Sequence, residues 1–151
     1  MKYFRNFLLT LTSIFIVIPA HAERNWINLG RSTLGPWDIF VDKDSIRKMD
    51  DNVYAAISYQ DLGVVQRGLD EFDSKGRSIF NTKIRYRSYR SIGLYDCKNN
   101  LTGHLETRYY LGSKPSKETL VHVKKESDPV WLNIIVEPKI FNYVCNKMWN
   151  R

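Results

Sequence analysis

Apolar and polar residues alternate along much of the chain from residue 26 onward, with the period expected of strands that bury one face. The clearest run has apolar side chains at Val53, Ala55, Ile57 and Tyr59. The same spacing occurs at 101–111 and 121–123, and shorter apolar runs lie at 26–29 and 37–41. Gly and Pro between those two shorter runs predict a turn. About five to seven closely spaced strands predict an α+β, β-rich fold with an antiparallel sheet.

One predicted strand, which ends at Cys97, carries the most distinctive chemistry. The even positions Ile84, Tyr86, Ile92 and Leu94 are apolar, and the opposite face carries Lys83, Arg85 and Arg87. Arginine forks pair with carboxylate, sulfate or phosphate, and tyrosines add contact area at a low entropic cost. The candidate ligand-binding residues are therefore Lys83, Arg85, Tyr86, Arg87, Tyr89 and Arg90. The alternative is an ordinary solvated strand face whose charges suppress edge pairing.

Two short helices are predicted outside the strands. Asp42 is placed to cap a helical turn through Ser45 and Arg47. Near the C-terminus, Pro138 suits the first turn of a longer helix. One face of that helix carries Phe141, Cys145 and Met148, flanked by Ile140 and Val144. This spacing predicts that Cys145 lies on the buried side of the helix.

Residues 1–22 have the three-part layout of a cleaved signal peptide. Lys2 and Arg5 precede an apolar run at 7–18, which closes on small residues up to Ala22. We expect cleavage after Ala22, so that the mature chain begins at Glu23. The run of about twelve residues is shorter than the roughly twenty that cross a bilayer, so no membrane anchor is expected. Because no Cys lies near the cleavage point, we do not expect a lipoprotein.

The remaining residues, 23–151, suffice for one modest core and contain no linker or repeat, so a single domain is expected. The chain has 23 Lys and Arg against 16 Asp and Glu, a formal net charge of +7. The signal holds two of those cations and no acid, which makes the mature charge +5. This charge favours anionic partners such as headgroups, polysaccharides or acidic proteins. Export removes the usual nucleic-acid targets, so no nucleic-acid partner is expected.

The chain has only two cysteines, Cys97 and Cys145, and both lie after the signal. In an oxidising compartment, an isolated pair in a small domain is most simply a structural disulfide. A redox-active pair is the alternative, but the close CxxC spacing that lowers a thiol pKa is missing. A disulfide would tether the C-terminal helix to the sheet.

The sequence offers no catalytic constellation. His104 and His122 have no third ligand at metal-binding spacing, and neither a nucleophile elbow nor a phosphate-binding Gly loop occurs. We therefore expect a protein that is not an enzyme, with no metal site and no cofactor.

Several short motifs in order resemble the bacterial surface-adhesin protein E family. They are Trp26-Ile27-Asn28-Leu29, Ile39-Phe40-Val41-Asp42, Asp44-Ser45-Ile46, Tyr95-Asp96-Cys97, Trp131, Pro138 and Cys145. The resemblance covers nearly all of residues 23–151 and implies an antiparallel sheet with a disulfide-held C-terminal helix. The shared residues suggest fold determinants, so Trp26 and Trp131 are expected in the core.

The resemblance also implies an exported protein of Gram-negative bacteria that binds host matrix or serum proteins. Two hypotheses follow. The first is a surface or secreted adhesin, and the second is a periplasmic, envelope-associated structural domain with no host ligand, which the missing lipid anchor favours. The sequence leaves the oligomeric state open, a homodimer included.

Overall fold

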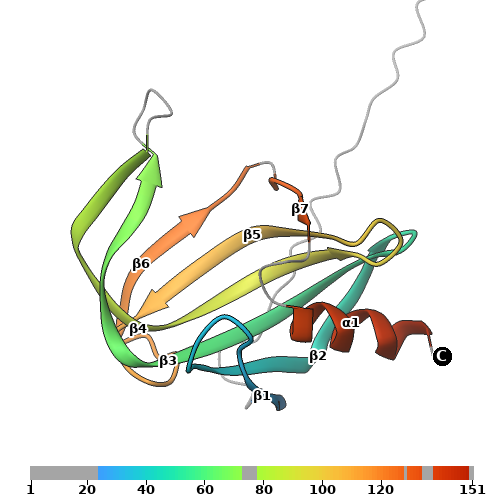
Figure 1. Ribbon diagram of the computed structural model, residues 1–151, viewed down its shortest axis with the longest axis horizontal. Coiled ribbons are helices and arrows are strands. Elements are labelled where there is room, and N and C mark those ends of the chain that lie inside the picture. Colours follow the sequence, from blue (N-terminus) through green and yellow to red (C-terminus); the bar gives the residue numbers. More distant parts are fainter. Residues whose placement is uncertain (1–23, 73–77, 128, 134–137, 150–151) are drawn as a thin grey trace, which may run out of the picture.

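One antiparallel sheet with a single helix against it forms the body of the protein (Figure 1). The structure is a computed structural model that describes residues 24–72, 78–127, 129–133 and 138–149. The strands and helix are β1 (Trp26–Arg31), β2 (Asp38–Asp50), β3 (Val53–Phe72), β4 (Ser78–Asp96), β5 (Leu101–Tyr110), β6 (Leu120–Lys125), β7 (Leu132–Asn133) and α1 (Pro138–Trp149). Strands β1 to β6 pair in chain order, and β7 pairs with β5. This confirms the predicted fold class.

Helix α1 and the β2–β3–β4 part of the sheet share the hydrophobic core. The buried helix residues are Ile140, Phe141, Val144 and Cys145, and the sheet contributes Ile39, Val41, Ala56, Tyr95 and Cys97. Burial of Phe141 and Cys145 confirms the predicted inner face of the helix. The side chain of Met148, which the same prediction included, lies outside the described residues.

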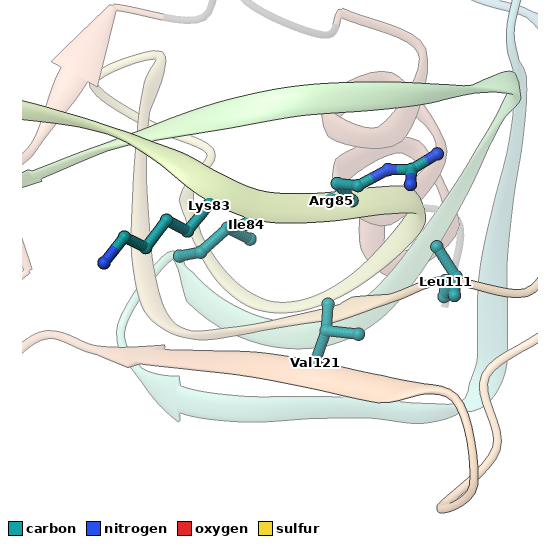
Figure 2. A pocket seen from close by; sticks show the side chains of 5 residues that line it. All are labelled: Lys83, Ile84, Arg85, Leu111 and Val121. Carbon is teal, nitrogen blue, oxygen red and sulfur yellow. The ribbon is translucent and has the colours of Figure 1, made fainter.

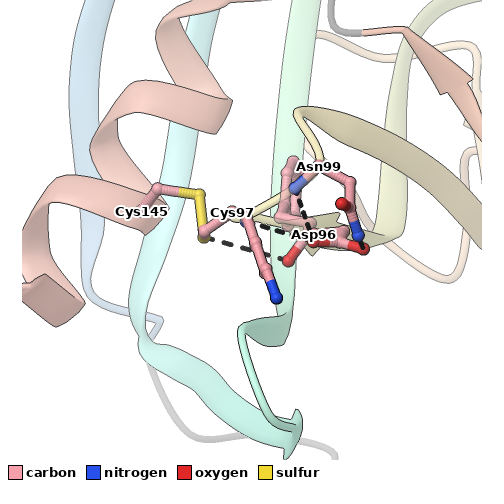
Figure 3. The surroundings of a disulfide bond; sticks show 6 residues. Asp96, Cys97, Asn99 and Cys145 are labelled. Atoms are coloured by element: carbon pink, nitrogen blue, oxygen red, sulfur yellow. Dashed lines mark hydrogen bonds between the residues drawn. A yellow bond between two sulfur atoms is a disulfide. The ribbon is translucent and has the colours of Figure 1, made fainter.

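The predicted disulfide joins Cys97, just after β4, to Cys145 in α1 (Figure 3). The two residues are separated by 48 positions, and their Cα atoms lie 5.6 Å apart. A turn beside the bond is organised by Asp96, whose Oδ1 accepts hydrogen bonds from the backbone N–H groups of Lys98 (3.1 Å) and Asn99 (3.0 Å). The cross-link therefore ties the helix to a well-organised end of the sheet.

The short helix predicted after Asp42 is wrong, because β2 continues through this segment. The register against β3 shifts between Asp42 and Arg47, which marks a bulge. Asp42 does organise the local turn: its Oδ1 accepts from the Asp44 N–H (3.1 Å), and Ser45 Oγ donates to the Asp42 carbonyl (2.7 Å). Ser45 Oγ also accepts from the Ile57 N–H of β3 (2.8 Å). A side-chain hydroxyl thus continues the pairing with β3 that a helix would have broken.

Neither of the two tryptophans expected in the core is fully buried. Trp26 is half-buried, with its ring 5.7 Å from the Tyr59 ring. Trp131 is 40% exposed, so its placement in the core is wrong. It lies close to Gly103, where there is no side chain to cover its ring.

Candidate binding groove

The β3–β4 hairpin extends beyond the rest of the sheet (Figure 1). Strand β4 pairs with β5 only through residues 88–96, while its pairing with β3 continues to Ser78. Along residues 78–87, the edge of β4 that faces away from β3 therefore has no partner among the described strands. A free edge of this kind presents unpaired backbone donors and acceptors to an incoming chain.

A groove of about 330 Å³ lies between this free part of β4 and the start of β6 (Figure 2). Its lining residues are Lys83, Ile84, Arg85, Leu111 and Val121. Leu111 follows the last residue of β5 and is 46% exposed, and Val121 of β6 is 43% exposed. The groove thus combines exposed apolar surface with two cations, a composition suited to a partner that is both apolar and acidic.

The two groove cations are available to a partner. Lys83 and Arg85 are both exposed, and neither forms an ion pair within the described part of the chain. In Figure 2 their side chains extend away from Ile84 in different directions along β4. Their charges are therefore not neutralised by a neighbouring carboxylate.

The other four candidate residues lie outside the groove lining. Arg87 is half-buried and forms an ion pair with Asp61 (Nε to Oδ1, 3.4 Å). Tyr86 and Tyr89 lie against Tyr109, with ring centroids 4.9 and 5.9 Å away. Arg90 is paired with Arg108 of β5 and does not line the groove. The structure thus divides the six candidates among several surroundings and brings only Lys83 and Arg85 together in the groove.

Tyr109, at the centre of the tyrosine cluster, remains protonated at physiological pH. Burial, together with the nearby Tyr86 and Glu126, raises the pKa of Tyr109 to about 12. The His122 ring lies 5.9 Å from the Tyr109 ring. Since the Tyr109 hydroxyl stays neutral, it provides apolar packing and hydrogen bonding rather than charge.

Sequence reasoning did not identify three of the groove residues, Ile84, Leu111 and Val121, and placed Ile84 on the face opposite the basic side chains. Leu111 shares its parity with the apolar positions of β5, which predicts burial. It is exposed because β5 ends at Tyr110, one residue earlier. A sequence signal for Val121 is equally hard to find, since an apolar residue in an alternating strand ordinarily indicates a buried face.

Within the described residues, neither a metal-binding cluster nor a membrane-spanning helix is present. No group of three or more His, Cys, Asp or Glu side chains is placed there to hold a metal ion. No helix in that part of the chain is long and apolar enough to cross a membrane.

Together the sheet, the tethered helix and the groove define a small disulfide-linked β-sheet domain. Residues 26–146 match the family model described as Surface-adhesin protein E, so the chain belongs to the surface-adhesin protein E family. No curated protein matches the chain.

Solved structures similar to this chain include three of Haemophilus influenzae protein E. Crystal form II of that protein has a TM-score of 0.50 at 14% identity, covering 85% of this chain and 93% of its own. Its selenomethionine form and a further structure give TM-scores of 0.47 and 0.48, both at 15% identity. Both alignments cover 87% of this chain. They cover 92% of the selenomethionine chain and 89% of the chain in the further structure. At 14% identity, the similarity to crystal form II shows a shared fold alone.

Proposed function

We propose that this protein is an exported adhesin that contacts host matrix or serum proteins through the groove between β4 and β6. Membership of the surface-adhesin family supports the general role. The choice of surface rests on the lining of one groove. Exposed Lys83 and Arg85 lie there beside the apolar side chains of Ile84, Leu111 and Val121. The role requires no catalytic group, no cofactor and no nucleic acid.

The chemistry of the groove defines the kind of segment it would accept. Apolar side chains of the partner would cover Leu111 and Val121, while carboxylates would meet Lys83 and Arg85. Exposed charges of this kind act mainly by steering the encounter and selecting acidic partners. The contact should therefore be sensitive to salt, because the Debye length is only about 8 Å at physiological ionic strength.

Changing Lys83 and Arg85 together to Ser tests the groove. At low salt, we expect this double variant to bind an immobilised extract of basement-membrane matrix roughly tenfold more weakly than the parent, with a flatter salt dependence. The melting temperature should hardly change, because both side chains face solvent. Biolayer interferometry across a series of NaCl concentrations measures both effects.

The matched control changes Lys98 and Lys117 to Ser. This variant also loses two positive charges, but from exposed positions outside the groove. If both double variants lose affinity equally, net charge alone controls binding and the groove is not the contact surface. Unchanged binding by the Lys83/Arg85 variant would also exclude the groove as the contact surface.

A further inference from the structure

A row of side chains crosses three strands on the face of the sheet opposite α1. Ala56 of β3 packs in the core with α1, and because side chains alternate, Tyr59 points to the opposite face. Tyr59 is paired with Arg90 of β4, and Arg90 is paired in turn with Arg108 of β5. Two arginines thus lie directly opposite one another, an arrangement that destabilises a sheet when no anion intervenes.

Asp42 and Glu106, two carboxylates on this face, already form ion pairs with other cations. Arg24 Nη1 lies 2.9 Å from Asp42 Oδ2. Arg108 forms an ion pair with Glu106, whose other oxygen lies 3.6 Å from Lys125 Nζ. Arg90 forms no ion pair or side-chain hydrogen bond among the described residues. Arg24, Arg108 and Lys125 therefore each have a carboxylate within ion-pair distance, and Arg90 beside them has none among the described residues.

The surroundings of Arg90 make this shortage unfavourable. Its side chain is half-buried beside Tyr110, which is only 4% exposed. Partial burial lowers the pKa of Arg90, and repulsion from Arg24 and Arg108 lowers it further against the opposing effects of Tyr110 and Glu106. A guanidinium removed from water without a partner costs free energy. A bound anion would remove that cost.

A second polar group in the same row also has no partner. Tyr59 is 6% exposed, and its buried hydroxyl makes no hydrogen bond. Burial raises the pKa of Tyr59 to about 12, and Asp61 adds to the rise while Ser88 and Arg87 oppose it. Ser88 Oγ itself donates to the Gly112 carbonyl (2.7 Å). Unpartnered buried polar groups are uncommon in folded proteins. The charged groups that act on the Tyr59 hydroxyl are Asp61 and Arg87, so the case for an anion rests on Arg90 and Arg108.

We propose that Arg90 and Arg108 form a site for one oxyanion, a sulfate, phosphate or carboxylate group, on the face opposite α1. The planar guanidinium forks hold such groups through paired hydrogen bonds. Arg24 adds positive potential at the same place. Arg90 does not line the groove between β4 and β6, so this site does not depend on the proposed function.

Calorimetric titration with inorganic sulfate and inorganic phosphate tests the site directly. Ionic strength is held constant with NaCl, so that general screening does not change during the titration. We expect saturable binding and a shift of the Arg90 side-chain N–H signal in ¹H–¹⁵N spectra. A sulfated disaccharide forms a third arm, because an anionic group carried by a larger molecule has the same chemistry. Binding of the disaccharide alone would support a site for such a molecule, and binding of the inorganic ions would support a free anion.

Three variants separate this site from general charge effects. Arg90→Met should weaken oxyanion binding roughly tenfold or more, the loss expected for charge-assisted hydrogen bonds. Arg90→Lys retains the charge but loses the fork, so it should bind with intermediate affinity. Arg67→Met removes an exposed arginine from the β3–β4 hairpin and should bind as the parent does.

The same variants give a readout of stability. Without oxyanion, Arg90→Met should melt at or above the temperature of the parent, because it removes an uncompensated charge opposite Arg108. Sulfate should then raise the melting temperature of the parent more than that of Arg90→Met. Equal responses in both proteins, or no saturable binding in any of the three arms, would overturn the proposal.

Discussion

Replacing Cys97 and Cys145 together by Ser is expected to lower the free energy of unfolding by about 4 kcal/mol. The estimate follows from the loop that the bond closes across a separation of 48 residues, which restricts the unfolded chain. For a domain of this size, such a loss lowers the melting temperature by roughly 10 °C or more. Denaturant titration followed by circular dichroism gives the free energy, and a thermal scan gives the melting temperature.

Chemical reduction supplies the control for this variant. A reducing agent should destabilise the parent to about the level of the double Ser variant and should leave the variant itself unchanged. The folded parent should show no free thiol, since both cysteines are in the bond. Rapid thiol labelling of untreated parent, or equal stability of parent and variant, would contradict this prediction.

Truncating Phe141 to Ala should cost about 3–5 kcal/mol, the range for removing a buried aromatic side chain. Phe141 is 4% exposed and packs edge-on against Tyr95 of β4, with ring centroids 6.4 Å apart. It therefore anchors α1 to the sheet independently of the disulfide. Urea denaturation at equilibrium measures the loss.

Asn142 provides the matched control, since it is the next residue in α1 and is exposed. Asn142→Ala should change stability by no more than about 0.5 kcal/mol. A loss of similar size in both variants would mean that helix propensity, rather than packing of Phe141, determines the effect. Because Phe141 and the disulfide hold the same helix, their combined removal should not be additive.

Strand faces and the tethered helix could be predicted because their signals are local. Alternation places Ile57 and Tyr59 together on one buried face, and Pro138 marks the start of α1. Alternation did not show that α1 packs on the other face of β3, at Ala56. The long β3–β4 extension could not be predicted in this way. Gly63 and Gly68, which ordinarily indicate turns, lie inside β3 with φ values of 73° and 88°. They accommodate register shifts within a continuous strand rather than ending it.

The candidate groove depends on contacts that alternation does not encode. Ile84 and Val121 lie far apart in the sequence and share the groove only because the β4 edge and β6 approach one another. In the same way, the pairing of Arg90 with Arg108 depends on the register of β4 against β5. Local patterns identified Lys83, Arg85 and Arg90 as basic strand residues, and the topology assigned them to different surfaces.

Protease treatment of intact Gram-negative cells that express the full chain tests the adhesin role most directly. If the protein acts at the surface, added protease should digest it in intact cells, and N-terminal sequencing of the untreated protein should begin at Glu23. A periplasmic protein with a known location serves as the control for outer-membrane integrity and should remain intact. Digestion only after the outer membrane is permeabilised would contradict the surface role and support a periplasmic structural domain.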